Sequence, residues 1–191
     1  MAEPIELPPG AALAGLCAVL VLDRLLPRLP PRPIVGLVDE VAHLATGTIV
    51  LAAVPEPSGE FAAGLAAGSV LIDVDHVPEL WGRAWLRAPG VRPFPHALVT
   101  PALVARLPGR FARGAAVGLA AHLLRDLATG STGVALLWPL ARRGFTIRYG
   151  TYVGALALLV SRARRAERQR PTRSGDPSTG AALESPSSPS V

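Results

Sequence analysis

The residues best suited to chemistry lie in one short stretch, Asp73-Val74-Asp75-His76. Two carboxylates and an imidazole follow a run of Ala, Gly, Leu and Val, where an ionised Asp costs free energy unless another charge compensates it. A divalent cation compensates such charges effectively. The stretch therefore predicts a metal-ligand cluster around which several apolar segments gather.

Two further pairs repeat the combination of His and Asp. Asp39 and His43 are four residues apart, and so are His122 and Asp126. On a helix this spacing places both side chains on one face, where they can bind one ion or act as a ligand and its orienting partner. Imidazole and carboxylate ligands without thiolates suit Zn, Mn or Fe better than Ca or Mg.

These pairs also have structural interpretations. His43 alone could be a hydrogen-bonded histidine inside a helix bundle, and His122 with Asp126 could form a pair on a helix surface. The stretch 73–76 is harder to explain in this way, because three ligand side chains adjoin an apolar segment.

The acidic residues that precede His43 are open to a second interpretation as well. Asp39 and Glu40 could pair with Arg24 or Arg125 and thereby hold helices together.

The composition favours a membrane protein over a soluble domain. Half of the 191 residues are hydrophobic and 17% are charged, whereas soluble domains carry about a quarter; the mean hydropathy is +0.37. The formal net charge is +5, but the arginines lie beside apolar segments, which favours membrane topology over nucleic-acid binding. The single cysteine, Cys17, excludes an internal disulfide and a Cys-based zinc site.

Five apolar runs predict an all-α, polytopic membrane bundle of 4–5 spans. We expect the spans near these ranges: 8–26, 34–54, 60–76, 114–137 and 148–161. The third range is short, so four spans with a re-entrant piece are an alternative. Arg and Pro recur between the third and fourth runs, which predicts an interfacial loop with one short helix around 97–107.

Arginine-rich segments predict the orientation and the domain boundary. By the positive-inside rule, residues 24–32, 83–113 and 162–173 should face the cytoplasm, while the acidic N-terminus and the 55–60 turn should face outward. The expected location is the inner or plasma membrane. The end of the chain is rich in Arg, Ser and Pro, which predicts a disordered tail, 162–191, after a membrane-embedded domain, 1–161.

This orientation would bring the candidate ligands to one depth. If the second and fourth spans both start at the cytoplasmic face, His43 lies nine residues into its span and His122 eight. The 73–76 stretch closes the third span at the same face. Ionisable residues inside a membrane are functional candidates by default.

The order of these motifs resembles the predicted membrane-bound metal-dependent hydrolases, a family that includes LexA-binding inner-membrane putative hydrolases. Ile72-Asp73-Val74-Asp75-His76 is similar to the family's P-D-x-D-H, with Ile72 in place of Pro. The stretch from His122 to Thr129 matches H-x-x-x-D-x-x-T, and Leu137-Trp138-Pro139 follows it as in the family. His43 corresponds to the family's early histidine.

A further element of the family, H-R-x-x-T-H-S, is partly present. The stretch from Val91 to Ala97 keeps Arg92 and His96. Val91, Pro95 and Ala97 replace its first His, its Thr and its Ser. On spacing alone His96 would be a loop residue, whereas the resemblance implies that it is a metal ligand.

The resemblance implies hydrolysis by a metal-activated water. The implied ligands are His43, Asp73, Asp75, His76, His96, His122 and Asp126, with Zn as the first choice and Mn or Fe as alternatives. A carboxylate that is not a ligand, Glu40 or Asp39, would accept a proton. Arg92 or Arg125 would bind an anionic group of the substrate.

The membrane setting favours membrane lipids as partners and a lipid or another amphiphilic phosphoester as substrate, with no nucleic acid. The alternative function is that of a non-enzymatic membrane protein, whose structural metal or polar cluster docks a partner or handles ions.

Overall fold

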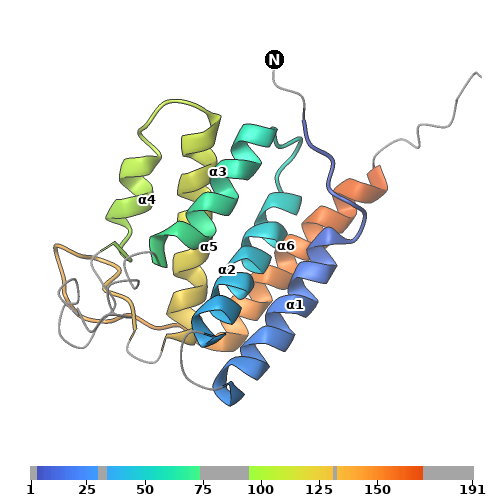
Figure 1. Ribbon diagram of the computed structural model, residues 1–191. Coiled ribbons are helices and arrows are strands. Elements are labelled where there is room, and N and C mark those ends of the chain that lie inside the picture. Colours follow the sequence, from blue (N-terminus) through green and yellow to red (C-terminus); the bar gives the residue numbers. More distant parts are fainter. Residues whose placement is uncertain (1–3, 30–33, 74–94, 131–132, 170–191) are drawn as a thin grey trace, which may run out of the picture.

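The computed structural model describes residues 4–29, 34–73, 95–130 and 133–169. Within these ranges the chain is helical (Figure 1), and its β structure is limited to two isolated bridges. The helices are α1 (Ala11–Leu25), the short 3-10 helix η1 (Leu26–Arg28), α2 (Ile34–Ala52), α3 (Gly59–Val70), α4 (Val99–Val104), α5 (Arg110–Thr129) and α6 (Tyr149–Gln169). The all-α class is thereby confirmed.

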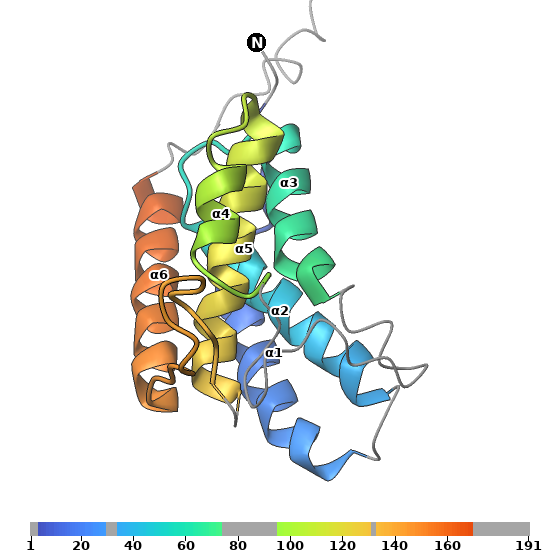
Figure 2. The ribbon, with the colours of Figure 1, turned by 90° about the vertical axis from the view of Figure 1, so that its left-hand side faces the viewer.

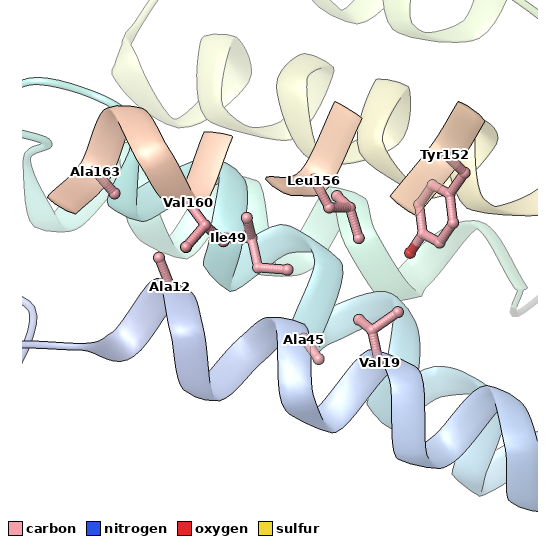
Figure 3. Close-up of a cluster of buried hydrophobic side chains, with 8 residues drawn as sticks. All are labelled: Ala12, Val19, Ala45, Ile49, Tyr152, Leu156, Val160 and Ala163. Atoms are coloured by element: carbon pink, nitrogen blue, oxygen red, sulfur yellow. The ribbon is translucent and has the colours of Figure 1, made fainter. Parts of the chain in front are cut away.

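Helices α1, α2 and α6 pack around a common apolar core (Figure 3). The core is built mainly from small and β-branched residues, which let the helix backbones approach closely. At the crossing of α1 and α2, a Cβ added to Gly15 would lie 2.9 Å from Ile49 Cγ1. The buried core residues are Ala12, Val19, Ala45, Ile49, Tyr152, Leu156, Val160 and Ala163.

Helices α3 and α5 form the most extensive helix pair in the described part of the chain. Gly64 and Gly68 of α3 lie against the carbonyl oxygens of Phe111 and Ala115 in α5, respectively. Any Cβ there would come closer than the 3.0 Å that real Cβ atoms respect. Because the contacts advance in the same direction along both helices, α3 and α5 are parallel. Reciprocal contacts are made by Gly114 and Gly118 of α5.

Because α3 and α5 are parallel, the chain that connects them must run back along the bundle before α5 begins. Helix α4 lies alongside α5 and leads into it through a short loop (Figure 1, Figure 2). The short helix expected around 97–107 is therefore present as Val99–Val104. It packs against the bundle, with Pro101 buried.

This return corrects the predicted direction of the fourth apolar run. We expected the second and fourth spans to start at the same face, but α5 begins beside the start of α3, where α2 ends. His122 therefore reaches the layer of His43 from the C-terminal part of α5. The physical reason is that residues 95–109 run lengthwise along the bundle, which adds one traversal and reverses α5 and α6.

The arginine-rich segments consequently lie at both ends of the bundle. Arg162 of α6 lines a cavity together with the 55–57 turn. Arg24 of α1 lines a different cavity, at the N-terminal ends of α2 and α6. The described parts of these segments, 24–29 and 162–169, therefore do not share one face, contrary to the prediction for 24–32 and 162–173.

Among the described residues, one helix, α2, is long and apolar enough to cross a membrane. Helix α3 has 12 residues, which extend about 18 Å, whereas the hydrocarbon core is about 30 Å thick. The count of 4–5 spans stays a prediction. The exposed apolar side chains of α2 follow helical spacing: Ile34, Leu37, Val41 and Leu44.

Two expected boundaries differ from the structure. Helix α5 ends at Thr129, before the expected limit of 137, and its last turn is closed by the Gly130 N–H, which donates to the Asp126 carbonyl. Helix α6 continues to Gln169, past the expected domain boundary at 162, because Ala163 packs into the apolar core. Residues 170–191 of the predicted tail lie outside the described residues.

Candidate metal centre

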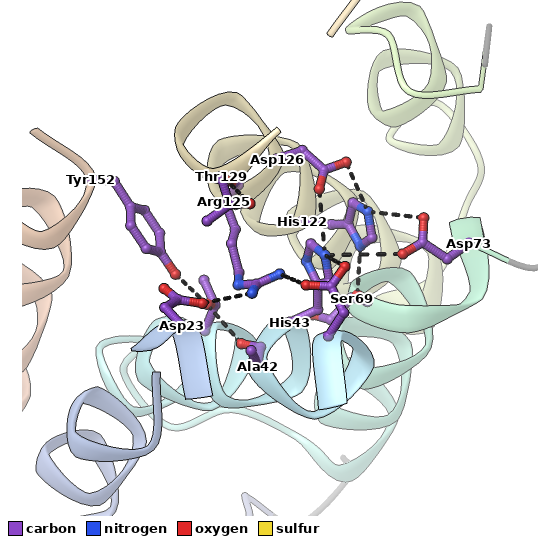
Figure 4. A network of polar contacts seen from close by, with 12 residues as sticks. Asp23, Ala42, His43, Ser69, Asp73, His122, Arg125, Asp126, Thr129 and Tyr152 are labelled. Atoms are coloured by element: carbon purple, nitrogen blue, oxygen red, sulfur yellow. Dashed lines mark hydrogen bonds and ion pairs between the residues drawn. The ribbon is translucent and has the colours of Figure 1, made fainter. Parts of the chain in front are cut away.

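Three histidine rings meet where α2, α5 and the segment before α4 come together. The exposed fractions of His43, His96 and His122 are all 0%. The rings of His43 and His122 are stacked, with centroids 3.6 Å apart and planes inclined by 6° (Figure 4). The His96 ring centroid is 5.3 Å from that of His122. Sequence segments far apart thus contribute to one buried cluster.

Asp126 faces all three rings from the turn of α5 that follows His122. Its Oδ2 atom is 3.2 Å from His122 Nε2 and 3.6 Å from His96 Nε2. Its Oδ1 atom is 3.4 Å from His43 Nε2. The i,i+4 spacing of His122 and Asp126 therefore places both side chains on the buried face of α5.

Asp73, three residues after the end of α3, faces the same three ring nitrogens. A hydrogen bond of 2.8 Å joins its Oδ1 atom to His96 Nε2, and the same oxygen lies 3.5 Å from His122 Nε2. The other oxygen, Oδ2, is 4.0 Å from His43 Nε2. Two overlapping groups have all their ligand atoms within 4.8 Å of one another: His43, Asp73 and His122, and His96, His122 and Asp126.

The His122 ring is oriented by a backbone carbonyl. Its Nδ1 atom lies 2.8 Å from the Ser69 carbonyl oxygen. Because a carbonyl can only accept, Nδ1 carries the proton of this hydrogen bond, and Nε2 is the nitrogen that faces the two carboxylates. This arrangement is typical of metal-binding histidines, whose second nitrogen donates to a carbonyl or carboxylate.

The glycine crossing of α3 and α5 explains why the Ser69 carbonyl can reach His122. Gly118 lies one turn before His122, and a Cβ there would lie 2.9 Å from Ser69 N. A Cβ on Gly47 of α2 would likewise meet Ser69 Oγ at 2.5 Å. Small residues thus bring three helices together around Ser69, next to the histidine rings.

Both ring nitrogens of His43 are buried and have no hydrogen-bond partner within the described residues. Its Nε2 atom nevertheless has carboxylate oxygens of Asp126, Asp39 and Asp73 at 3.4, 3.9 and 4.0 Å. A cation between this nitrogen and these oxygens would satisfy atoms that are otherwise costly to bury. The donor set of imidazole and carboxylate fits Zn, Mn or Fe.

Two acidic residues of α2 border the cluster. The half-buried Glu40 lies close enough to Asp73 and His122 for electrostatic interaction. Its Oε2 atom is buried and has no hydrogen-bond partner in the described ranges. Asp39 Oδ1 instead forms an ion pair with Arg125 at 2.6 Å.

Arg125 belongs to a second buried cluster, adjacent to the histidines. Its exposed fraction is 0%, and its second terminal nitrogen pairs with Asp23 Oδ1 at 2.6 Å. The Tyr149 hydroxyl donates to Asp23 Oδ2 at 2.9 Å. Arg125 thus pairs with Asp39, as one structural interpretation expected, and its terminal nitrogens are occupied by protein carboxylates.

Among the predicted site residues, the structure brings together the following: His43, Asp73, His96, His122, Asp126, Asp39 and Glu40. Asp75, His76 and Arg92 lie outside the described residues. Sequence reasoning missed Ser69, which acts through its backbone, and the pair of Asp23 and Tyr149. Asp23 stood out only as a charge inside an apolar run.

The comparisons with known proteins identify one family. The sequence model described as YdjM inner membrane protein matches residues 38–176. This range is more than half of the chain and includes every described histidine and aspartate of the cluster. No curated protein and no solved structure matches the chain. The protein is an inner-membrane protein and belongs to the YdjM inner membrane protein family.

Proposed function

We propose that this inner-membrane protein is a metal-dependent hydrolase with its metal at the histidine cluster. One observation carries the proposal: the Nε2 atoms of His43, His96 and His122 face the same two carboxylates in a buried site. Zinc is the first choice because it accepts nitrogen and oxygen ligands in low coordination numbers, and Mn or Fe are alternatives.

The distribution of charge supports a cation at this cluster. Asp73 and Asp126 both face the histidine rings, and two ionised carboxylates at close quarters repel one another. Within the described ranges, Arg125 is the buried cation nearby, and it is already shared by Asp23 and Asp39. An external divalent cation would supply the missing positive charge.

The side chains divide the chemistry between them. When bound, a divalent cation lowers the pKa of a coordinated water from about 15.7 towards about 7 and polarises an oxygen of the substrate. Glu40 Oε2, which is buried without a hydrogen-bond partner in the described part of the chain, would accept the proton of the attacking water. His122 keeps its orientation because Nδ1–H donates to Ser69.

We propose a lipid or another amphiphilic phosphoester as substrate. The protein is located in the inner membrane, and α2 carries His43 on its buried face and Leu37 and Val41 on its exposed face. If α2 crosses the bilayer, the cluster lies within one helix diameter of the lipid. An amphiphilic substrate would then reach the site from the membrane.

The proposal is tested by metal analysis of the protein purified in detergent. The wild type should contain at least about one equivalent of Zn, Mn or Fe, and His122→Ala and Asp126→Asn should lose it. Glu60→Gln, which removes an exposed carboxylate of α3, should keep the metal and serves as the control. A wild-type protein without metal after supplementation would overturn the proposal.

Turnover is assayed on a phospholipid in mixed micelles and on a soluble phosphoester. Hydrolysis of the phospholipid that is lost in Glu40→Gln, with metal retained, is the expected result. Bound metal without turnover on either substrate would contradict the hydrolase and favour a structural metal.

A further inference from the structure

We propose that Arg125 is a positioning residue that holds Asp39 with one carboxylate oxygen towards the metal centre, and that Asp23 and Tyr149 keep Arg125 in place. This inference rests on the proposed function, because it assigns a role to residues beside the same site. It differs from the substrate-binding role that the sequence suggested for Arg125.

The contacts of Arg125 leave little freedom to its guanidinium group. One terminal nitrogen pairs with Asp39 Oδ1 and the other with Asp23 Oδ1, both at 2.6 Å. These carboxylates come from α2 and α1, so the planar fork joins α5 to two other helices (Figure 4). Tyr149 adds α6 through its hydrogen bond to Asp23.

The same contacts determine which oxygen of Asp39 faces the histidines. Since Oδ1 is held by Arg125, the second oxygen, Oδ2, is turned towards His43 Nε2 at 3.9 Å. That nitrogen also lies 3.4 Å from Asp126 Oδ1. Asp39 therefore places a carboxylate oxygen at the edge of the proposed metal position, where it can ligate the ion or accept from its water.

Asp39 also connects the centre with the outside of the bundle. Its side chain is 28% exposed, and it lines a cavity of about 540 Å³ together with Asp23, Arg24 and Tyr149. Arg125, by contrast, is fully buried. A substrate anion in this cavity could not displace two protein carboxylates from Arg125 without leaving both uncompensated.

Positioning and simple electrostatics predict opposite effects on metal affinity. Removing the positive charge of Arg125 would strengthen cation binding if the charge alone mattered, because like charges repel. Loss of an orienting partner instead typically weakens metal binding by about 10- to 100-fold. The sign of the change therefore separates the two roles.

A double variant removes the anchor without changing the net charge. Arg125→Gln with Asp23→Asn deletes one positive and one negative side chain and leaves the Asp39 side chain in place. We expect the Zn²⁺ affinity, measured by competition with a chromophoric chelator in detergent, to fall by about 10- to 100-fold. Arg24→Gln removes a positive charge from the same cavity and should change the affinity by less than about threefold.

The same double variant in an Asp39→Asn protein tests whether the loss of Zn²⁺ affinity depends on Asp39. In Asp39→Asn, adding the same double variant should cause no further loss of affinity, since the oxygen to be positioned is gone. If the double variant does not fold, as judged by circular dichroism and size exclusion, Tyr149→Phe replaces it. This variant removes one hydrogen bond to Asp23, so we expect a loss of about two- to fivefold.

The outcomes distinguish this inference from the proposed function. Wild-type protein that binds no metal overturns both. Wild-type protein that binds metal, with unchanged or tighter binding in the double variant, overturns the positioning role and leaves the metal centre intact. Equal further loss in the Asp39→Asn background would show a global structural effect and would also overturn it.

Discussion

Two polar clusters lie next to each other around α2 and α5, and their charges are balanced in different ways. In the arginine cluster, Arg125 lies between Asp23 and Asp39, with both N–O distances at 2.6 Å. In the histidine cluster, Asp73 and Asp126 face three imidazoles at distances from 2.8 to 4.0 Å.

This difference in charge balance distinguishes a polar cluster that joins helices from one that is suited to bind an ion. The arginine cluster contains its own cation, and each of its two carboxylates forms an ion pair with Arg125. The histidine cluster combines carboxylates with imidazole nitrogens, and both ring nitrogens of His43 have no hydrogen-bond partner in the described residues. A divalent cation, as we propose, would compensate these carboxylates and coordinate the imidazole nitrogens.

The largest expected effect comes from breaking the arginine cluster. Arg125→Ala leaves two carboxylates uncompensated, which costs about 3 to 5 kcal/mol for buried pairs; Asp39 is 28% exposed, so we expect about 3 kcal/mol. Equilibrium unfolding in mixed micelles measures the loss, with or without metal. Arg24→Ala, an exposed control, should stay within about 0.5 kcal/mol, and a similar value for Arg125→Ala would contradict the comparison.

The histidine cluster should depend on metal for its stability. At a free metal concentration of 100 times Kd, binding stabilises the folded state by about 2.7 kcal/mol. The melting temperature of the wild type in detergent should therefore fall on addition of EDTA. The melting temperature of Asp126→Asn should be the same with and without EDTA. If EDTA lowered the melting temperatures of both proteins equally, a metal at this site would be refuted.

A substitution at the glycine crossing of α3 and α5 should destabilise the fold and also weaken metal binding at the histidine cluster. In Gly118→Ala the new Cβ would clash with the Leu65 carbonyl oxygen, and overpacking of this kind costs about 1 to 3 kcal/mol. The shift of α5 against α3 should also weaken metal binding, because it moves His122 away from the Ser69 carbonyl. Gly154→Ala meets no atom within 4 Å and should leave stability and metal affinity unimpaired.

The smallest effect is expected at the edge of the arginine cluster. Tyr149→Phe removes one hydrogen bond to Asp23, worth about 0.5 to 1.5 kcal/mol. Because the residue is partly exposed, we expect the lower half of this range in the unfolding free energy. A loss above about 3 kcal/mol would mean that Tyr149 does more than hold Asp23.

Much of the candidate site was predictable because helix periodicity is local. The i,i+4 spacing of His43 with Asp39 and of His122 with Asp126 decides which side chains share a helix face. Apolar flanks indicate that these faces are buried. The role of His96 could not be derived in this way, because a histidine among prolines carries no periodicity, and it came from the resemblance alone.

By itself the sequence determined the helical class, the His and Asp side chains of the cluster and the small residues at the helix crossings. Only the tertiary structure decided the direction of α5, the partners of Arg125 and the carbonyl that orients His122. The physical reason is that these features depend on contacts between distant segments. Glycines at 64, 68, 114 and 118 permit a close crossing, but whether the helices run parallel depends on the return of the chain through residues 95–109.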